Sequence, residues 1–114
     1  MFQGSYTVLV TPFDASGAVD EVALRRLVNW QIEQGVHGLI PLGSTGEFLS
    51  LSREERDLVG AVTVEAAAGR VPVLVGTAAE STDDAIALSR AAEAAGADGL
   101  MIIPPFYCSP TPDE

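Results

Sequence analysis

Residues 43–47 (Gly-Ser-Thr-Gly-Glu) bring two hydroxyl groups and two glycines together directly after an apolar run at 38–42. Glycine lets the backbone approach a ligand closely, and hydroxyl and amide groups are suitable donors for a carboxylate or phosphate. The segment matches neither G-x-G-x-x-G nor a Walker A sequence, and the next helix start, at Ser52, is too distant for a Rossmann or P-loop site. From these residues alone, ligand binding and a tight structural turn remain equally open.

A second candidate is Tyr107, in the segment 104–107 (Pro-Pro-Phe-Tyr), which follows the apolar run 99–103. Two prolines stiffen the chain there, and a phenol held in place can relay a proton or donate a hydrogen bond to an oxyanion. The alternative is that both aromatic side chains serve packing. Residues 11–13 (Thr-Pro-Phe) follow the first apolar run in the same way and form a third candidate site.

The chain contains no lysine, because arginine accounts for all 6 of its basic residues. These 114 residues therefore cannot form a lysine Schiff base. We interpret Cys108, the single cysteine, as a small buried residue and not a nucleophile, since His37 would lie at the opposite end of its strand. The acidic residues are scattered over helix faces, so we predict no metal site and no cofactor.

The composition describes a folded acidic chain, with 47% hydrophobic residues and a net charge of −10. Without a basic stripe it cannot neutralise nucleic-acid phosphates or bind an anionic membrane surface, so we expect neither partner. No apolar run approaches the roughly 20 residues of a membrane span, and we expect no signal peptide at residues 1–5. Because a single cysteine excludes an internal disulfide, these features together predict a cytoplasmic location.

Four apolar runs alternate with three helical stretches, as in a parallel α/β fold. The runs are rich in Val, Ile and Leu and predict buried strands at 6–10, 38–42, 71–75 and 99–103. Capping signals predict helix starts at Asp20, at Ser52 with Glu55 in a capping box, and at Ser81. Helix ends are expected at three glycines: Gly35, Gly69 and Gly96.

The strand–helix units also resemble one another, because G-x-x-G-L occurs at 35–39 and again at 96–100. This repetition favours a (β/α)8 barrel over a flavodoxin-like nucleotide-binding sheet, which is our third interpretation. Residues 111–114 (Thr-Pro-Asp-Glu) have the pattern of a helix start, so we expect the protein to continue. A full barrel needs about 250 residues, and residues 1–114 would be the N-terminal half of one such domain, with the remainder outside the chain.

Three segments carry a resemblance to a known family: residues 6–13 (Tyr-Thr-Val-Leu-Val-Thr-Pro-Phe), 43–47 and 104–107, in this order and spacing. Together they resemble the dihydrodipicolinate synthase/N-acetylneuraminate lyase family, and the likeness runs along the whole chain. It implies a (β/α)8 barrel, a tetramer built from dimers, and a class I aldolase-type lyase reaction. In that reaction pyruvate or another 2-oxo acid forms a Schiff base on a lysine and then meets an aldehyde. The lysine would lie past Glu114, so we expect this chain to be inactive alone.

The resemblance also implies roles for individual residues. Ser44 and Thr45 would bind the carboxylate of the 2-oxo acid, with the backbone amides of their loop. Ser44 would also join a proton relay that Tyr107 completes, reaching into the neighbouring subunit's site across a dimer interface. Three neighbours would shape the loop: Gly43, Gly46 and Glu47.

Two departures leave the branch of the family open. The synthase branch typically has two threonines where this chain has Ser44 and Thr45, and two tyrosines where it has Phe106 and Tyr107. The variants found here recur in the N-acetylneuraminate lyase and sugar-acid dehydratase or aldolase branches, which are therefore the second interpretation after dihydrodipicolinate synthase. A non-catalytic half-barrel that self-assembles is a further alternative, because four strands would leave two apolar sheet edges.

Overall fold

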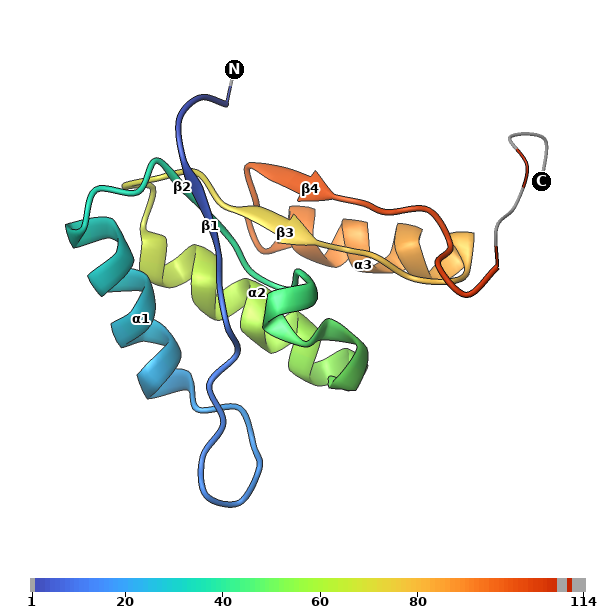
Figure 1. The fold of residues 1–114 in the computed structure, drawn as a ribbon, viewed down its shortest axis with the longest axis horizontal. Coiled ribbons are helices and arrows are strands. Elements are labelled where there is room, and N and C mark those ends of the chain that lie inside the picture. Colours follow the sequence, from blue (N-terminus) through green and yellow to red (C-terminus); the bar gives the residue numbers. More distant parts are fainter. Residues whose placement is uncertain (1, 109–110, 112–114) are drawn as a thin grey trace.

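The computed structural model describes residues 2–108 and 111, in which four short strands alternate with three α-helices (Figure 1). Along the chain these are β1 (Tyr6–Val8), α1 (Glu21–Glu33), β2 (Gly38–Ile40), α2 (Arg53–Ala67), β3 (Leu74–Gly76), α3 (Thr82–Ala94) and β4 (Gly99–Met101). Two short 3-10 turns separate β2 from α2: η1 (Ser44–Gly46) and η2 (Phe48–Ser50). The predicted alternation is confirmed, whereas the helix start predicted at 111–114 lies largely outside the described residues.

The strands run parallel and neighbour one another in chain order. β1 pairs with β2 and β3 pairs with β4 along their full lengths. The two pairs meet at a narrow seam, where Leu39 bridges Val73 and the amides of Leu39 and Gly76 donate to the carbonyls of Pro72 and Pro41, each at 3.0 Å. A flavodoxin-like sheet would place β1 between β2 and β3. The third interpretation is therefore wrong, and the order is that of a barrel.

Side-chain caps begin the three helices where the sequence predicts them. Asp20 accepts a hydrogen bond from a first-turn amide of α1 at 2.9 Å, and Ser81 does the same for α3 at 3.1 Å. Ser52 and Glu55 form the reciprocal capping box on α2. Each cap satisfies amides that a helix cannot pair within itself, which is why a local pattern locates these boundaries.

The repeated G-x-x-G-L segment has the same structure in both copies. Gly35 and Gly96 follow α1 and α3 in the left-handed region, at φ 87° and 91°. Gly38 and Gly99 begin β2 and β4 opposite a large side chain of the preceding strand, and an added Cβ would come within 2.0 Å and 2.5 Å of it. In each copy, the first glycine ends a helix, and the second begins a strand and leaves space for a large side chain of the neighbouring strand. The repeat therefore reflects two equivalent β-α-β units.

Several predicted boundaries differ from the structure by a few residues. The strands contain three residues each where five were predicted, because apolar character continues past the paired backbone. β3 begins at Leu74 instead of residue 71, since Pro72 has no amide to donate to a neighbouring strand. α2 ends before Gly69, because Ala68 already takes the left-handed conformation at φ 50°.

The helices cover one face of the strand layer and bury the core against it (Figure 1). Leu24 and Val28 of α1 and Val59 of α2 are at most 1% exposed. On α3, Leu88 is buried, whereas Ile86 is 45% exposed. Because the strands are parallel and adjacent, their carboxyl ends meet at one edge, and the loops that carry the candidate residues gather there.

Candidate functional site

Residues 43–47 form a tight turn at the carboxyl end of β2. The amide of Gly46 donates to the carbonyl of Gly43 at 2.9 Å, which closes η1. Leu42, just before the turn, and Glu47, its last residue, have left-handed backbones, with φ of 63° and 57°. Such conformations are costly for residues other than glycine and concentrate at functional sites. The surrounding structure must therefore hold this turn in place.

The two glycines let the turn pack directly against the chain that leaves β1. A Cβ at Gly43 would lie 2.7 Å from Val8 Cγ1, and one at Gly46 would lie 3.0 Å from the carbonyl oxygen of Leu9. The Thr11 hydroxyl, only 5% exposed, donates to the carbonyl of Gly46 at 2.7 Å. This buried bond joins the third candidate segment to the first, so the loops after β1 and β2 form one unit.

Ser44 and Thr45 lie on the solvent side of this unit. Both residues are exposed, and within the described part of the chain their hydroxyls and backbone amides donate to no other group. Four neighbouring donors on a turn that is fixed from beneath can bind the two oxygens of a carboxylate. The geometry therefore leaves these donors available to a ligand, and their role in binding stays a prediction.

The segment 104–107 leaves β4 at the same edge of the strand layer. The ring of Phe106 meets the ring of Phe48 edge-on, with centroids 6.0 Å apart and planes at 90°, so this segment packs beside η2. Tyr107 itself is 90% exposed, and its hydroxyl forms no hydrogen bond with the described residues. The two candidate loops are thus neighbours, while the relay between Ser44 and Tyr107 stays a prediction.

Comparison with known sequences decides the family. The sequence profile of the Dihydrodipicolinate synthetase family matches residues 1–114. The chain belongs to this family. The 4-hydroxy-tetrahydrodipicolinate synthase of Rhizobium meliloti is 53% identical over 111 residues, which make up 97% of this chain and 38% of the relative. The chain therefore spans 38% of the length of this curated relative.

Solved structures of dihydrodipicolinate synthetase family members have the same fold. The 4-hydroxy-tetrahydrodipicolinate synthase of Methylacidiphilum fumariolicum SolV matches with a TM-score of 0.93 at 39% identity, covering 97% of this chain and 37% of that one. The dihydrodipicolinate synthase of Acinetobacter baumannii complexed with pyruvate matches with a TM-score of 0.94 at 41% identity, covering 97% and 38%. These likenesses confirm the predicted fold class, the N-terminal half of a (β/α)8 barrel.

In this dihydrodipicolinate synthetase family member, Arg56 of α2 contacts two of the loops at the carboxyl edge of the strand layer. Its guanidinium carbon lies 5.2 Å from the centroid of the Phe48 ring, and Nη2 donates to the carbonyl of Ala78 at 2.7 Å. Burial, followed by the charge of Arg53, lowers the pKa of Arg56, and the guanidinium stays protonated. Arg56 thus connects η2 to the loop after β3.

Glu80, in the loop after β3, was missed by the sequence analysis. Its carboxylate accepts hydrogen bonds from the amide of Phe106, at 3.2 Å to each oxygen, and from the amide of Tyr107, at 2.9 Å. A single glutamate has no motif to mark it. Its place between a predicted strand and the helix cap Ser81 was a usable signal, because loops at the carboxyl ends of parallel strands build the site.

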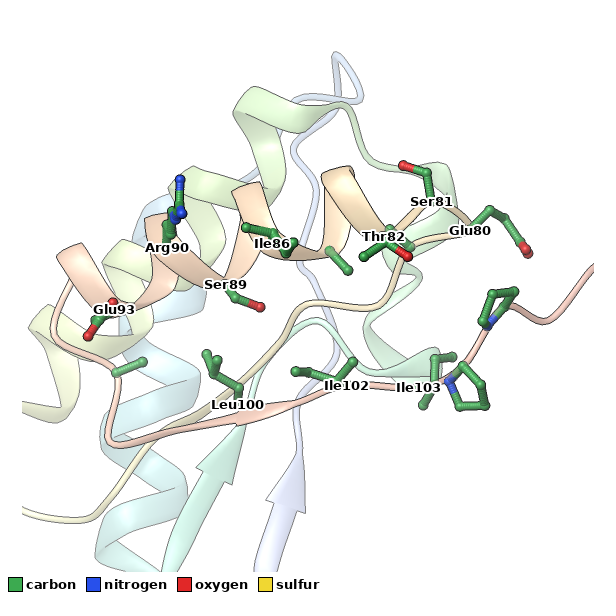
Figure 2. Close-up of a pocket in the computed structure, with 15 residues that line it drawn as sticks. Glu80, Ser81, Thr82, Ile86, Ser89, Arg90, Glu93, Leu100, Ile102 and Ile103 are labelled. Carbon is green, nitrogen blue, oxygen red and sulfur yellow. The ribbon is translucent and has the colours of Figure 1, made fainter. Parts of the chain in front are cut away.

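A groove of about 900 Å³ lies between α3 and the chain that leaves β4 (Figure 2). Ile86, Leu100 and Ile102 contribute to its lining and are 45%, 40% and 58% exposed. Figure 2 shows Glu80 and Ile103 at the same end of the groove, on its two opposite walls. None of the predicted site residues lines this groove, so it is separate from the turn at 43–47.

The remaining candidate residues lie away from that turn. His37 is at the amino end of β2 as predicted, where its Nδ1 accepts from the amide of Ser5 at 3.0 Å. Cys108 is exposed, so its predicted burial is wrong: the turn after Pro105 carries it to the surface. Among the residues that the structure describes, no His, Cys, Asp and Glu side chains gather into a possible metal site. No helix in that part of the chain has the length and apolar character to cross a membrane.

Proposed function

We propose that these residues supply the carboxylate-binding loop of a Schiff-base-forming 2-oxo-acid synthase, with 4-hydroxy-tetrahydrodipicolinate synthase as the first candidate. The observation that carries this proposal is the turn at 43–47, where the hydroxyls and amides of Ser44 and Thr45 donate to none of the residues that the structure describes. The Rhizobium meliloti relative bears that enzyme name, and the Acinetobacter baumannii structure is a complex with pyruvate. The complex with pyruvate supports pyruvate as the 2-oxo acid, and we propose an aldehyde as the second substrate.

In this mechanism a lysine outside the 114 residues forms an imine with the carbonyl carbon of pyruvate and releases water. Ser44 and Thr45 hold the carboxylate and so orient that carbon toward the amine. Loss of a proton from the methyl group then gives an enamine, whose carbon attacks the aldehyde. Ser44 and Tyr107 relay the protons that these steps move. The imine itself serves as the electron sink, so the reaction requires no separate cofactor.

The proposal extends to the assembly and location of the protein. Tyr107 is 90% exposed, which supports a role in the site of a neighbouring subunit, across a dimer interface within a homotetramer. The high acidity and the single cysteine support a cytoplasmic location. The rest of the barrel, including the lysine, would come from residues that follow Glu114.

A chimera tests the proposal, with residues 1–114 in place of the matching segment of the Rhizobium meliloti relative. Pyruvate and borohydride should leave a reduced adduct on a lysine of the chimera. Thr45→Val should raise KM for pyruvate about tenfold, and Ser44→Ala should lower kcat as well, because each removes a donor to charge. Ser50→Ala, which removes an exposed hydroxyl of η2, is the matched control. No adduct at saturating pyruvate would exclude the Schiff-base mechanism. Unchanged kcat and KM in both variants would exclude the turn at 43–47 as the carboxylate-binding site.

A second candidate is the N-acetylneuraminate lyase or sugar-acid dehydratase branch. It is favoured by Ser44 and by Phe106 before Tyr107, which depart from the two threonines and two tyrosines typical of the synthase branch. The enzyme expressed from the complete reading frame distinguishes the two. Formation of 4-hydroxy-tetrahydrodipicolinate supports the first candidate, whereas cleavage of N-acetylneuraminate or dehydration of a sugar acid supports the second.

A further inference from the structure

The backbone after β4 is held mainly by one side chain from another loop. Among the described residues, the amides of Phe106 and Tyr107 donate only to the Glu80 carboxylate, at 3.2 Å to both oxygens and at 2.9 Å. Two consecutive amides that converge on one anion form a concave donor site, and bonds to a charged acceptor are stronger than neutral ones. Glu80 therefore fixes the direction in which the chain presents the Tyr107 side chain.

Glu80 can do this because both of its flanks are themselves fixed. Upstream, the amide of Thr77 donates to the carbonyl of Met101 at 3.1 Å, and the carbonyl of Ala78 accepts from Arg56 at 2.7 Å. Downstream, Ser81 caps α3, whose amino end favours a nearby negative charge. The carboxylate is thus presented from a rigid edge and not from a free loop.

The Phe106 ring provides a second anchor for the same segment. It packs edge-on against Phe48, whose ring also lies against the Arg56 guanidinium. The carboxylate of Glu80 and the ring of Phe48 come from the loops after β3 and β2, so they hold the loop after β4 from two directions. The ring contact fixes Phe106, whereas among the described residues only Glu80 accepts a hydrogen bond from the amide of Tyr107.

We infer that Glu80 is a positioning residue for the proton-relay tyrosine, acting by binding the backbone amides of Phe106 and Tyr107. The inference rests on the proposed function, because it takes the relay role of Tyr107 as given. Glu80 contacts neither substrate nor the reacting atoms in this assignment. Its effect on the reaction must therefore pass through Tyr107, so a substitution of Glu80 should have little effect on kcat once the Tyr107 hydroxyl has been removed.

The first test measures the bonds directly in the 114-residue chain. Amide hydrogen exchange by NMR should become about tenfold faster at Tyr107 in Glu80→Ala, because the charged acceptor is lost. Glu80→Gln, which keeps one oxygen acceptor, should show a smaller increase. Glu33→Gln removes one exposed negative charge from α1 and should leave both exchange rates unchanged. Unchanged exchange at Phe106 and Tyr107 in Glu80→Ala would overturn the inference.

The second test measures coupling in the chimera. Glu80→Ala should lower kcat about tenfold with KM for pyruvate unchanged, and it should have less than a twofold further effect when Tyr107→Phe is already present. An equal effect of Glu80→Ala in both backgrounds would overturn the inference, because Glu80 would then act independently of Tyr107. If Tyr107→Phe alone leaves kcat unchanged, the proposed relay fails, and the inference fails with it. If Tyr107→Phe lowers kcat and Glu80→Ala does not, the inference alone fails.

Discussion

At the scale of single residues, the buried hydroxyl of Thr11 is the contact that most directly supports the candidate loop. Thr11→Val keeps the side-chain shape but leaves the buried carbonyl of Gly46 without its donor at 2.7 Å. We expect the free energy of unfolding to fall by about 1–3 kcal/mol, measured by urea denaturation. Thr45→Val removes an exposed hydroxyl from the same turn and should change it by less than about 0.5 kcal/mol. Equal losses in both variants would contradict a bracing role for Thr11.

A second residue-scale prediction concerns Asp14, in the loop between β1 and α1. Its Oδ1 accepts from the hydroxyl and amide of Ser16, at 2.6 Å and 2.8 Å, and from the amide of Ala18 at 3.1 Å. These bonds favour the charged form, and the Ser16 hydroxyl contributes most to lowering the pKa of Asp14. Because the pKa of Asp14 is lower in the folded state, the stabilisation that its carboxylate gives the loop is fully present above the unfolded-state pKa. This stabilisation is lost as the pH falls through the folded-state pKa.

Ser16→Ala should therefore raise the pKa of Asp14 toward its ordinary value. A titration of the Asp14 carboxyl carbon by NMR measures this, and Ser50→Ala is the control because the Ser50 hydroxyl is not among the described donors to Asp14. An unchanged pKa in Ser16→Ala would show that the backbone amides alone hold the carboxylate.

At the scale of elements, helices were more predictable than strands because their boundaries are local. Asp20, Ser52 and Ser81 cap helices with groups a few residues away, so a short sequence pattern contains the whole interaction. A strand ends where its partner strand stops pairing with it, and the partner lies far away in the sequence. Leu42 continues an apolar run yet turns out of the strand at φ 63°, and no local pattern marks that change.

Two glycines with opposite roles give the prediction at this scale. A Cβ at Gly76 in β3 would lie 2.1 Å from the carbonyl oxygen of Leu42, which is backbone that cannot move aside. A Cβ at Gly60 within α2 would make only ordinary contacts, with Val75 at 3.5 Å and Leu42 at 3.9 Å. Gly76→Ala should destabilise the chain by about 3 kcal/mol, whereas Gly60→Ala should stabilise it by about 0.5–1 kcal/mol, because alanine favours the helix.

Thermal or urea unfolding of both alanine variants checks this pair. Stabilisation by Gly60→Ala shows that an added methyl group fits between α2 and β3. A loss of stability in Gly60→Ala would contradict the room found beside Gly60, and no loss in Gly76→Ala would contradict the packing of β3 against the Leu42 backbone.

At the scale of the whole molecule, the location of the candidate site was predictable and its bracing was not. Parallel strands in chain order bring their following loops to one edge, so the turn at 43–47 and the segment at 104–107 could be predicted to be neighbours. The contacts that brace this edge join residues far apart in sequence, such as Phe48 with Phe106 and Glu80 with Tyr107. They depend on which strands pair side by side and in which register, and a single sequence does not show this.

The layer of four strands also has two outer edges, on β1 and β4, and among the described residues no further strand pairs with either edge. The β4 side is apolar, since Leu100 and Ile102 are 40% and 58% exposed beside the groove. Exposed strand edges favour pairing between chains, whereas a net charge of −10 opposes it. We therefore expect the 114-residue chain to self-associate, and to do so more strongly at high salt, where the repulsion is screened.

Sedimentation velocity at low and high salt tests this self-association with two matched variants. Ile102→Glu places a charge beside the β4 edge and should shift the chain toward monomer. Val22→Glu adds the same charge at a residue of α1 that is 60% exposed and should have a weaker effect. If the two variants behave alike, net charge controls association and the β4 edge does not. A monodisperse, cooperatively folded monomer at both salt concentrations would contradict the prediction and exclude a self-assembling half-barrel, which leaves the enzyme proposal as the one to pursue.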